Sequence, residues 1–351
     1  MILFQNFQSG VELMQEKKRK LFFSVCPLTA VLILLSVSPL QAAQPWELVP
    51  VGRTVGVTMD TKGLLVLGTG SVDGEGNRSY TPSKGVLQAG DLILEADGQH
   101  LENKEAFLDA VAESGGEPMT LLLERKGAQK EVEVTPVFSV ADHAYKIGAW
   151  VRDSIQGIGT VTWYDPAEKT FGALGHGVYD VDTGGLMLIR EGSLVEAGLT
   201  EVVKGKKGTP GELTGKVELA EKFAHIEKNT EAGIYGSVDA TVFDGEALPV
   251  AAAEEVKKGK AVLLSDLAGG GVQEYALQIE SIHLGGKSNK DMTIRITDER
   301  LLEMTGGIVQ GMSGCPIVQD GKLIGAVTYV MVNDPARGYG IFVENMLKAA
   351  E

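Results

Sequence analysis

Residues 306–327 read GGIVQGMSGCPIVQDGKLIGAV, and this stretch indicates both a fold and a chemistry. Gly311-Met312-Ser313-Gly314 predicts a tight turn that exposes a serine hydroxyl, because glycine tolerates the backbone angles that such a turn needs. The backbone N–H groups of Gly311 and Ser313 can both point at an oxyanion that forms beside that hydroxyl. Asp320-Gly321 is a hairpin turn signal, and a returning strand is expected over 323–327. The stretch therefore predicts a nucleophile, Ser313, with an oxyanion hole from Gly311 and Ser313.

A serine hydroxyl is a weak nucleophile at neutral pH and needs a neighbouring base. His176 lies in the segment FGALGHG, residues 171–177, where glycines on both sides leave its ring uncovered at the end of a predicted strand. His176 is the favoured base, and His143 and His283 remain alternatives.

The third catalytic group must be a carboxylate that orients the imidazole and stabilises its protonated form. Asp298 follows a predicted strand and precedes a short helical stretch, where it could equally serve as the helix cap. Spacing alone does not select Asp298 over four other aspartates, namely Asp180, Asp182, Asp266 and Asp291.

Short strands separated by glycine or Asp/Asn/Pro clusters dominate the chain from about residue 139 onward. The 45 glycines of the 351 residues fit many tight turns, and no G-X-Y period suggests collagen. Strands are predicted over 158–164, 170–174, 186–189, 261–264, 275–282, 292–296, 315–318, 326–332 and 339–343. The pattern predicts a mainly β domain over 139–351, built as a barrel or paired barrels.

The preceding region, residues 45–138, predicts a smaller α+β domain. Residues 83–98, SKGVLQAGDLILEADG, resemble the core motif of PDZ domains, and Asn103 can cap a short helix after it. The resemblance implies that a peptide adds a strand to a sheet edge and that a glycine-containing loop receives its terminal carboxylate. Val55, Gly56 and Val57 are the candidate residues of that loop, and a packing module without a ligand is the alternative.

The N-terminal region, residues 1–44, predicts export. Four basic residues at 17–20 precede the uncharged apolar segment 21–40, and small residues follow it. The apolar segment is also close to the length of a spanning helix, so a cleaved signal and a membrane anchor both remain open. By the positive-inside rule, the bulk of the protein is expected outside the cytoplasm.

The charge and the cysteine and histidine content exclude several classes of function. With 32 basic and 47 acidic residues the net charge is −15, which disfavours nucleic acid as a partner. The two cysteines are Cys26, within the apolar segment, and Cys315, so the exported part is not expected to depend on disulfides. The five histidines are scattered without a zinc-binding spacing, so no metal or cofactor is expected.

Three motifs resemble the stage IV sporulation protein B family of serine peptidases, which have a trypsin-like catalytic domain behind a PDZ domain. They are FGALGHG at 171–177, TGGIVQGMSGCPIVQDGKLIGAVT at 305–328 and VNDPARGYGIF at 332–342. The resemblance implies a double β-barrel with a catalytic triad of His176, Asp298 and Ser313. The chain departs from the family pattern at Cys315 and Tyr329. Cys315 as the nucleophile is not favoured, because its side chain follows the turn, away from the two N–H groups.

The resemblance also implies a role. It predicts a sporulation signalling endopeptidase that is exported from the forespore and cleaves itself. It then cuts a membrane-bound regulator of an intramembrane metalloprotease, which activates a late sigma factor. The PDZ domain would bind a peptide end of the regulator or of the protease. The alternatives are a PDZ-based peptide-binding regulator on an inactive peptidase scaffold and, last, a structural envelope protein.

Overall fold

The computed structural model describes residues 46–239, 242–285 and 288–351. The basic run at 17–20, the apolar segment at 21–40 and Cys26 lie outside the described residues. Within the described ranges, the chain contains no helix whose length and apolar character would suffice to cross a membrane.

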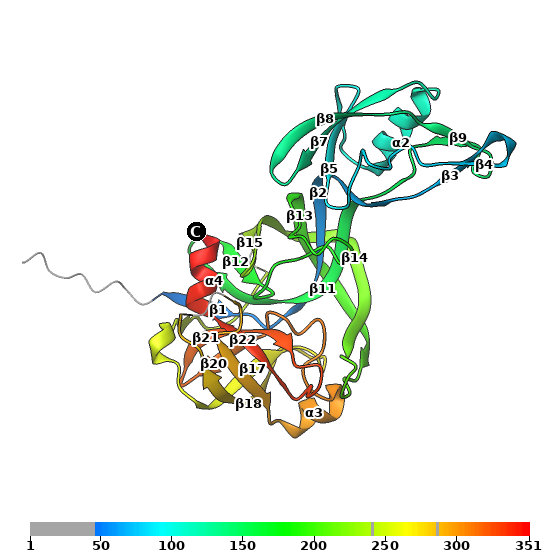
Figure 1. The fold of residues 1–351 in the computed structure, drawn as a ribbon. Helices are drawn as coiled ribbons and strands as arrows, with labels where there is room; N and C mark the ends of the chain where they lie inside the picture. Colours follow the sequence, from blue (N-terminus) through cyan, green and yellow to red (C-terminus); the bar gives the residue numbers. More distant parts are fainter. Residues whose placement is uncertain (1–45, 240–241, 286–287) are drawn as a thin grey trace, which may run out of the picture. The chain divides into compact units, whose positions relative to one another are not determined.

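The C-terminal half forms a closed antiparallel barrel of six strands (Figure 1). In barrel order they are β17 (Gly259–Ser265), β18 (Gln273–Ile282), β19 (Met292–Ile296), β22 (Arg337–Phe342), β21 (Lys322–Val330) and β20 (Pro316–Gln319). Leu263, Ile279, Ile294 and Ile317 are buried in its interior. Two helices follow strands of this barrel: α3 (Glu299–Thr305) after β19 and α4 (Val343–Ala350) after β22.

A second ring of antiparallel strands precedes this barrel. Each strand pairs with the next, and the first also pairs with the last, which closes the ring. The strands are β2 (Thr54–Thr69), β11 (Ala149–Asp165), β12 (Thr170–Ala173), β15 (Gly233–Val238), β14 (Glu212–Thr230) and β13 (Ile189–Val203). Short strands β1 (Glu47–Pro50) and β16 (Leu248–Pro249) extend it from β11, and a 3₁₀ turn at Ala253–Glu255 follows. Its interior includes Val57, Phe171 and Ile234.

The PDZ-like module is inserted between β2 and β11. The C-terminal part of β2 pairs with β5 (Leu92–Ala96), and β5 pairs with β6 (Gln99–His100) and β7 (Met119–Arg125). The remaining elements are β3 (Val72–Gly74), a 3₁₀ turn at Glu75–Asn77, β4 (Arg78–Tyr80), α2 (Lys104–Glu113), β8 (Ala128–Val134), β9 (Val137–Ser139) and β10 (Ala144–Lys146). As expected, Asn103 caps α2, and its side chain accepts a 2.9 Å hydrogen bond from the Ala106 N–H.

The mainly β fold, with a PDZ-like module and paired barrels, confirms the predicted fold class. The strand pairing nevertheless moves the domain boundaries. Residues 47–61 pair with β11 and β13 and therefore belong to the barrel, not to the predicted PDZ-like domain at 45–138. At the other end, Ile147 and Val151 pack in the core of the module, beyond the expected end at 138. The reason is that β2 and β11 run without interruption from the barrel into the module, so no linker marks the change.

Candidate active site

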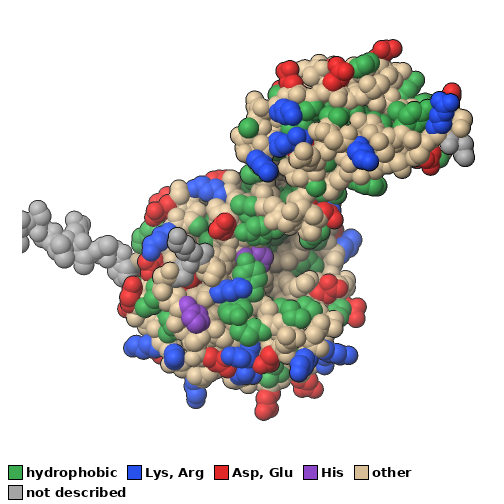
Figure 2. Space-filling model, in the orientation of Figure 1, with side chains coloured by type: hydrophobic (Ala, Val, Ile, Leu, Met, Phe, Trp, Pro, Cys, Tyr) green, Lys and Arg blue, Asp and Glu red, His purple; other side chains and the backbone are tan. Residues whose placement is uncertain are grey.

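One cleft of about 630 Å³ brings the predicted base and nucleophile together. His176 and Ser313 both line it, and His176 comes from the first barrel while Ser313 comes from the second. The other lining residues are Val57, Ile155, Gln156, Gly157, Ile158, Leu174, Gly177, Val178, Tyr179, Val181, Pro210, Ile308, Val309, Gln310, Gly311, Thr328, Tyr329, Val330 and Val332. None of these lining residues is Asp, Glu, Lys or Arg. On the face drawn in Figure 2, hydrophobic side chains likewise border histidine atoms.

The nucleophile loop is attached to β11 through two threonines that the sequence analysis missed. The Thr160 side chain donates to the Gly311 carbonyl at 2.9 Å, and its backbone N–H donates to the Ser313 carbonyl at 3.1 Å. The Thr162 hydroxyl donates to the Gly314 carbonyl at 2.8 Å. Because alternate residues of a strand face the same side, two threonines two positions apart were the available signal. They hold three carbonyls of the loop against β11.

The two N–H groups predicted to form the oxyanion hole are those of Gly311 and Ser313. Within residues 46–239, 242–285 and 288–351, neither the Gly311 nor the Ser313 N–H donates to an acceptor. Their peptide planes are held, because the Gln310 carbonyl accepts from Leu213 at 2.9 Å and the Met312 carbonyl accepts from Cys315 at 3.1 Å. Gly311 has φ +97°, and an added Cβ there would lie 2.7 Å from Leu213 Cδ1. The oxyanion role stays a prediction that this geometry permits.

His176 is presented by a sharp turn at the end of β12. Leu174 and Gly175 both have left-handed backbone angles, with φ of +69° and +70°. His176 Nδ1 lies 2.8 Å from the Gly177 carbonyl oxygen, so Nδ1 carries the proton and donates it. Nε2 is then the ring nitrogen with a free lone pair, which is the tautomer that a general base requires. Burial lowers the pKa of His176, which favours this neutral form.

Ser313 and His176 share the cleft without a direct hydrogen bond between them. The Ser313 hydroxyl donates to the Thr328 carbonyl at 2.9 Å. Tyr329, which follows Thr328 in the chain, stacks on the His176 ring, with ring centroids 5.2 Å apart and planes 19° from parallel. Tyr329, where the chain departs from the family pattern, is therefore part of the site. For proton transfer, the Ser313 side chain must rotate from Thr328 toward His176 Nε2.

The structure does not bring Asp298 to His176. Asp298 caps α3, accepts from the Arg300 N–H at 3.0 Å and pairs with the Arg300 guanidinium at 2.9 Å. The segment before β19 lies at the site: the Asn289 carbonyl accepts from the Thr328 hydroxyl at 2.7 Å, and Lys290 Nζ lies 5.7 Å from the Tyr329 ring centroid. Asp298 follows the other end of β19, whose five residues span about 16 Å. Its cap role, which the sequence left open, is the one this structure displays.

The other predicted alternatives are also occupied elsewhere. Asp180 pairs with Arg152, Asp182 pairs with Arg152, Asp266 accepts from Thr54, and Asp291 accepts from Phe342 and Asn345. His283 contacts Ser281 and Thr293, and neither His283 nor His143 lines the cleft. Cys315 is fully buried, and burial raises its pKa to about 12, which disfavours a thiolate nucleophile at this position.

The prediction that Val55, Gly56 and Val57 form the carboxylate-binding loop of the PDZ-like module is wrong. Val55, Gly56 and Val57 lie in β2, paired with β11, and the two valines are 1% and 5% exposed. A Cβ on Gly56 would lie 2.6 Å from Val217 Cγ1, so the backbone there is already covered by β14. The glycine allows close packing inside the barrel and does not form a ligand loop.

Asp298→Asn is expected to lower stability rather than to abolish catalysis. Chiefly because of Arg300, the pKa of Asp298 is lowered from 3.8 to about 2. The folded state thus favours the carboxylate, so this contribution is present above about pH 4 and is lost as the pH falls through about 2. We expect Asn to cost about 1 kcal/mol of unfolding free energy at pH 7, because the amide can still cap α3 but the ion pair with Arg300 is lost. Urea unfolding of the parent and of Asp298→Asn at pH 7 and pH 2.5 measures the loss of unfolding free energy. A loss of the same size at both pH values would contradict the stabilising role of the Asp298 charge.

The comparisons with known proteins identify the family of the chain. The family described as SpoIVB peptidase S55 matches residues 143–347, a range that contains His176, Asp298 and Ser313. The chain belongs to the SpoIVB peptidase S55 family. Membership confirms the resemblance seen in the sequence motifs and makes the chain a serine peptidase.

Other similar proteins cover parts of the chain. The putative zinc metalloprotease BH06270 of Bartonella henselae is 34% identical over 73 residues, 21% of this chain and 20% of that protein, so the chain spans about a fifth of that relative. The active form of the Rv3671c protease of M. tuberculosis has a TM-score of 0.34 and 18% sequence identity. The match covers 55% of this chain and 72% of the Rv3671c chain. The PDZ domain of the SdrC-like protein from Listeria monocytogenes has TM-score 0.21 and 22% identity, and covers 26% of this chain and 87% of its own.

Proposed function

We propose that this serine peptidase is an endopeptidase in which Ser313 is the nucleophile and His176 the general base. The observation that carries the proposal is their common cleft, beside two backbone N–H groups that have no other acceptor in the described chain. Nε2 of His176 takes the Ser313 hydroxyl proton while the Ser313 oxygen attacks the peptide carbonyl carbon. The Gly311 and Ser313 N–H groups stabilise the resulting oxyanion. The oxyanion then collapses and the C–N bond breaks as His176 gives its proton to the leaving amine, which leaves the acyl group on Ser313. A water molecule, deprotonated by His176, then attacks this ester and releases the acid and the free Ser313 hydroxyl.

The lining of the cleft supports a class of substrate. Apart from His176, it offers only neutral side chains, and valines and isoleucines from both barrels predominate. A charged side chain of the substrate would lose water there without a partner, which is costly. We propose that the peptidase cuts beside an uncharged apolar residue, and that an adjacent arginine or aspartate is disfavoured.

The biological role that we propose is sporulation signalling. Family membership and the N-terminal pattern at 17–43 support a peptidase that is exported from the forespore and acts outside the cytoplasm. There it would cleave itself and then a membrane-bound regulator of an intramembrane metalloprotease, leading to activation of a late sigma factor. The PDZ-like module would bind a peptide end of one of these proteins.

A second candidate is a peptide-binding regulator on an inactive scaffold. Two observations favour it: the Ser313 hydroxyl is hydrogen-bonded to the Thr328 carbonyl, and within the described chain no carboxylate contacts His176. Labelling with a fluorophosphonate separates the two proposals. Covalent modification mapped to Ser313 by mass spectrometry supports the peptidase, and a folded sample that stays unlabelled supports the regulator.

The pH dependence of hydrolysis tests the role of His176. The base must be neutral to accept a proton, and burial lowers the pKa of His176 below 6.5, its ordinary value. We therefore expect kcat/KM to rise with pH along an acidic limb whose midpoint lies below 6.5 and to stay high at pH 7. Initial rates on a neutral peptide between pH 4 and pH 8 measure the limb. A midpoint above 7 would contradict the assignment.

A further inference from the structure

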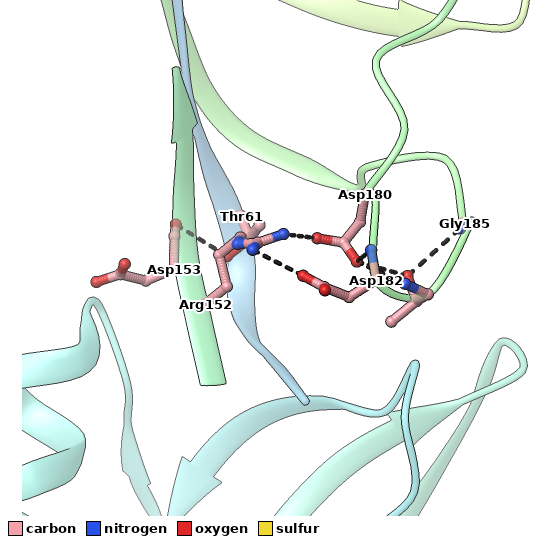
Figure 3. A network of polar contacts seen from close by, with 7 residues as sticks. Thr61, Arg152, Asp153, Asp180, Asp182 and Gly185 are labelled. Carbon is pink, nitrogen blue, oxygen red and sulfur yellow. Dashed lines mark hydrogen bonds and ion pairs between the residues drawn. The ribbon is translucent and has the colours of Figure 1, made fainter. Parts of the chain in front are cut away.

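An ion-pair network joins β11 to the loop that follows His176 (Figure 3). The Arg152 guanidinium binds Asp180 through Nη1 and Asp182 through Nη2, the latter at 2.8 Å. The Asp180 side chain is completely buried, while Arg152 is about a quarter exposed. Arg152 is therefore the cation that compensates a carboxylate withdrawn from water.

Asp180 organises the loop around its own carboxylate. Its Oδ1 accepts from the Asp182 N–H at 3.1 Å and from the Thr183 N–H at 2.8 Å, and the Thr183 hydroxyl donates to it at 3.0 Å. Its backbone carbonyl accepts from Gly184 at 2.8 Å, and its N–H donates to the Gly185 carbonyl at 2.9 Å. The fold of residues 180–185 thus depends on where this one carboxylate is held.

The same loop forms a wall of the active-site cleft. Val178, Tyr179 and Val181 line the cleft, and they begin two residues after His176. Asn229 holds the near end of the loop through two 2.9 Å hydrogen bonds to the Val178 backbone. Asn229 also donates to the Met187 carbonyl at 3.0 Å, at the far end of the loop. Arg152 holds the middle of the loop, at Asp180 and Asp182.

Arg152 lies where β11 passes from the barrel into the PDZ-like module. The neighbouring Asp153 accepts from the Lys104 N–H, at the start of α2, at 2.9 Å, and its carbonyl accepts from the Thr61 hydroxyl at 3.0 Å. The pairing of β11 with β2 is irregular between Arg152 and Ser154, and there Arg152 reaches the loop while Asp153 reaches the module (Figure 3). Both contacts depend on one short piece of β11.

We propose that Arg152 is a positioning residue of the peptidase: through Asp180 and Asp182 it fixes the wall of the cleft beside His176. This inference rests on the proposed peptidase function. Because Arg152 does not touch the reacting atoms, it acts through the loop, on the placement of the substrate and of the His176 turn.

The test uses a paired substitution that removes the ion pair without leaving a buried charge, R152Q together with D180N. We expect kcat/KM for a neutral peptide to fall about ten- to a hundredfold, mainly in kcat, because the displaced loop would no longer hold the substrate and His176 in the reactive geometry. Arg152→Lys, with Asp180 unchanged, keeps the positive charge, and its kcat/KM is expected to lie between that of the paired variant and that of the parent. Hydrogen exchange at residues 178–187 should become faster in the paired variant.

The matched control is R125Q together with D91N. Arg125 and Asp91 form a similar pair at 2.6 Å inside the PDZ-like module, with side chains 20% and 1% exposed, and neither lines the cleft. We expect this variant to keep kcat/KM within about twofold of the parent. If the two paired variants retain equal kcat/KM, or lose it equally, Arg152 has no positioning role. If the parent chain itself cleaves no peptide, the proposed function fails first, and this inference fails with it.

Discussion

Ser313→Ala is expected to reduce peptide hydrolysis by a factor of about 10⁴ or more, because the attacking oxygen is lost. The loop itself should survive, since its main contacts are made by backbone groups: the Gly311 and Ser313 carbonyls accept from Thr160, and the Gly314 carbonyl accepts from Thr162. The lost side-chain contact is one 2.9 Å hydrogen bond to Thr328, worth about 1 kcal/mol. Activity and stability should therefore separate in this variant.

The measurement is the cleavage of neutral peptides that carry valine, leucine, arginine or aspartate beside the candidate bond, together with thermal unfolding. Ser71→Ala, an exposed serine of the PDZ-like module, is the matched control and should keep full activity. A Ser313→Ala protein that hydrolyses these peptides at the parent rate would end the proposal that Ser313 is the nucleophile. Equal cleavage of all four parent peptides would reject the apolar substrate class alone.

Gly314→Ala is expected to destroy both the loop and the activity. Gly314 has φ +95°, and an added Cβ would lie 2.0 Å from the Thr160 carbonyl oxygen and 2.6 Å from the Leu174 backbone nitrogen. These neighbours are backbone atoms of β11 and of the turn before His176. The methyl group would therefore push the Ser313 loop of the second barrel away from the His176 turn of the first barrel. Backbone strain and overpacking together should cost about 2–4 kcal/mol. Misplacement of the nucleophile should lower kcat/KM at least about a hundredfold.

Gly321→Ala separates strain from collision. Gly321 also has a left-handed backbone, with φ +77°, but no atom lies within 4 Å of an added Cβ. We expect it to cost about 1–2 kcal/mol, from strain alone, and to keep kcat/KM close to that of the parent. Urea unfolding and peptide hydrolysis of the two variants provide the comparison. Similar activity in both would show that the contact between Gly314 and Thr160 does not hold the nucleophile in place.

The predicted triad shows where information from neighbouring residues ends. Ser313, Gly311 and His176 were predicted from their own glycine-rich surroundings, and the fold places all three at one cleft. Asp298 was carried over from the family resemblance, and here it satisfies the N-terminus of α3 and pairs with Arg300. A carboxylate two residues before an arginine at a helix start has local partners, and these partners hold it. Which carboxylate, if any, serves His176 depends on how the ends of distant strands meet.

The amino-acid sequence by itself determined the features whose causes lie within a few residues: the glycine turn at Ser313, the turn at His176, the Asn103 cap and the core motif of the PDZ-like module. Tertiary structure alone decided that β2 and β11 pass through both parts, that Val55–Val57 are buried, and that Thr160 and Arg152 anchor the two loops of the cleft. Turn and cap preferences arise from local backbone angles and hydrogen bonds. The contacts of Thr160 with Gly311 and Ser313 join residues about 150 positions apart and exist only once the barrels have closed, so no local pattern contains them.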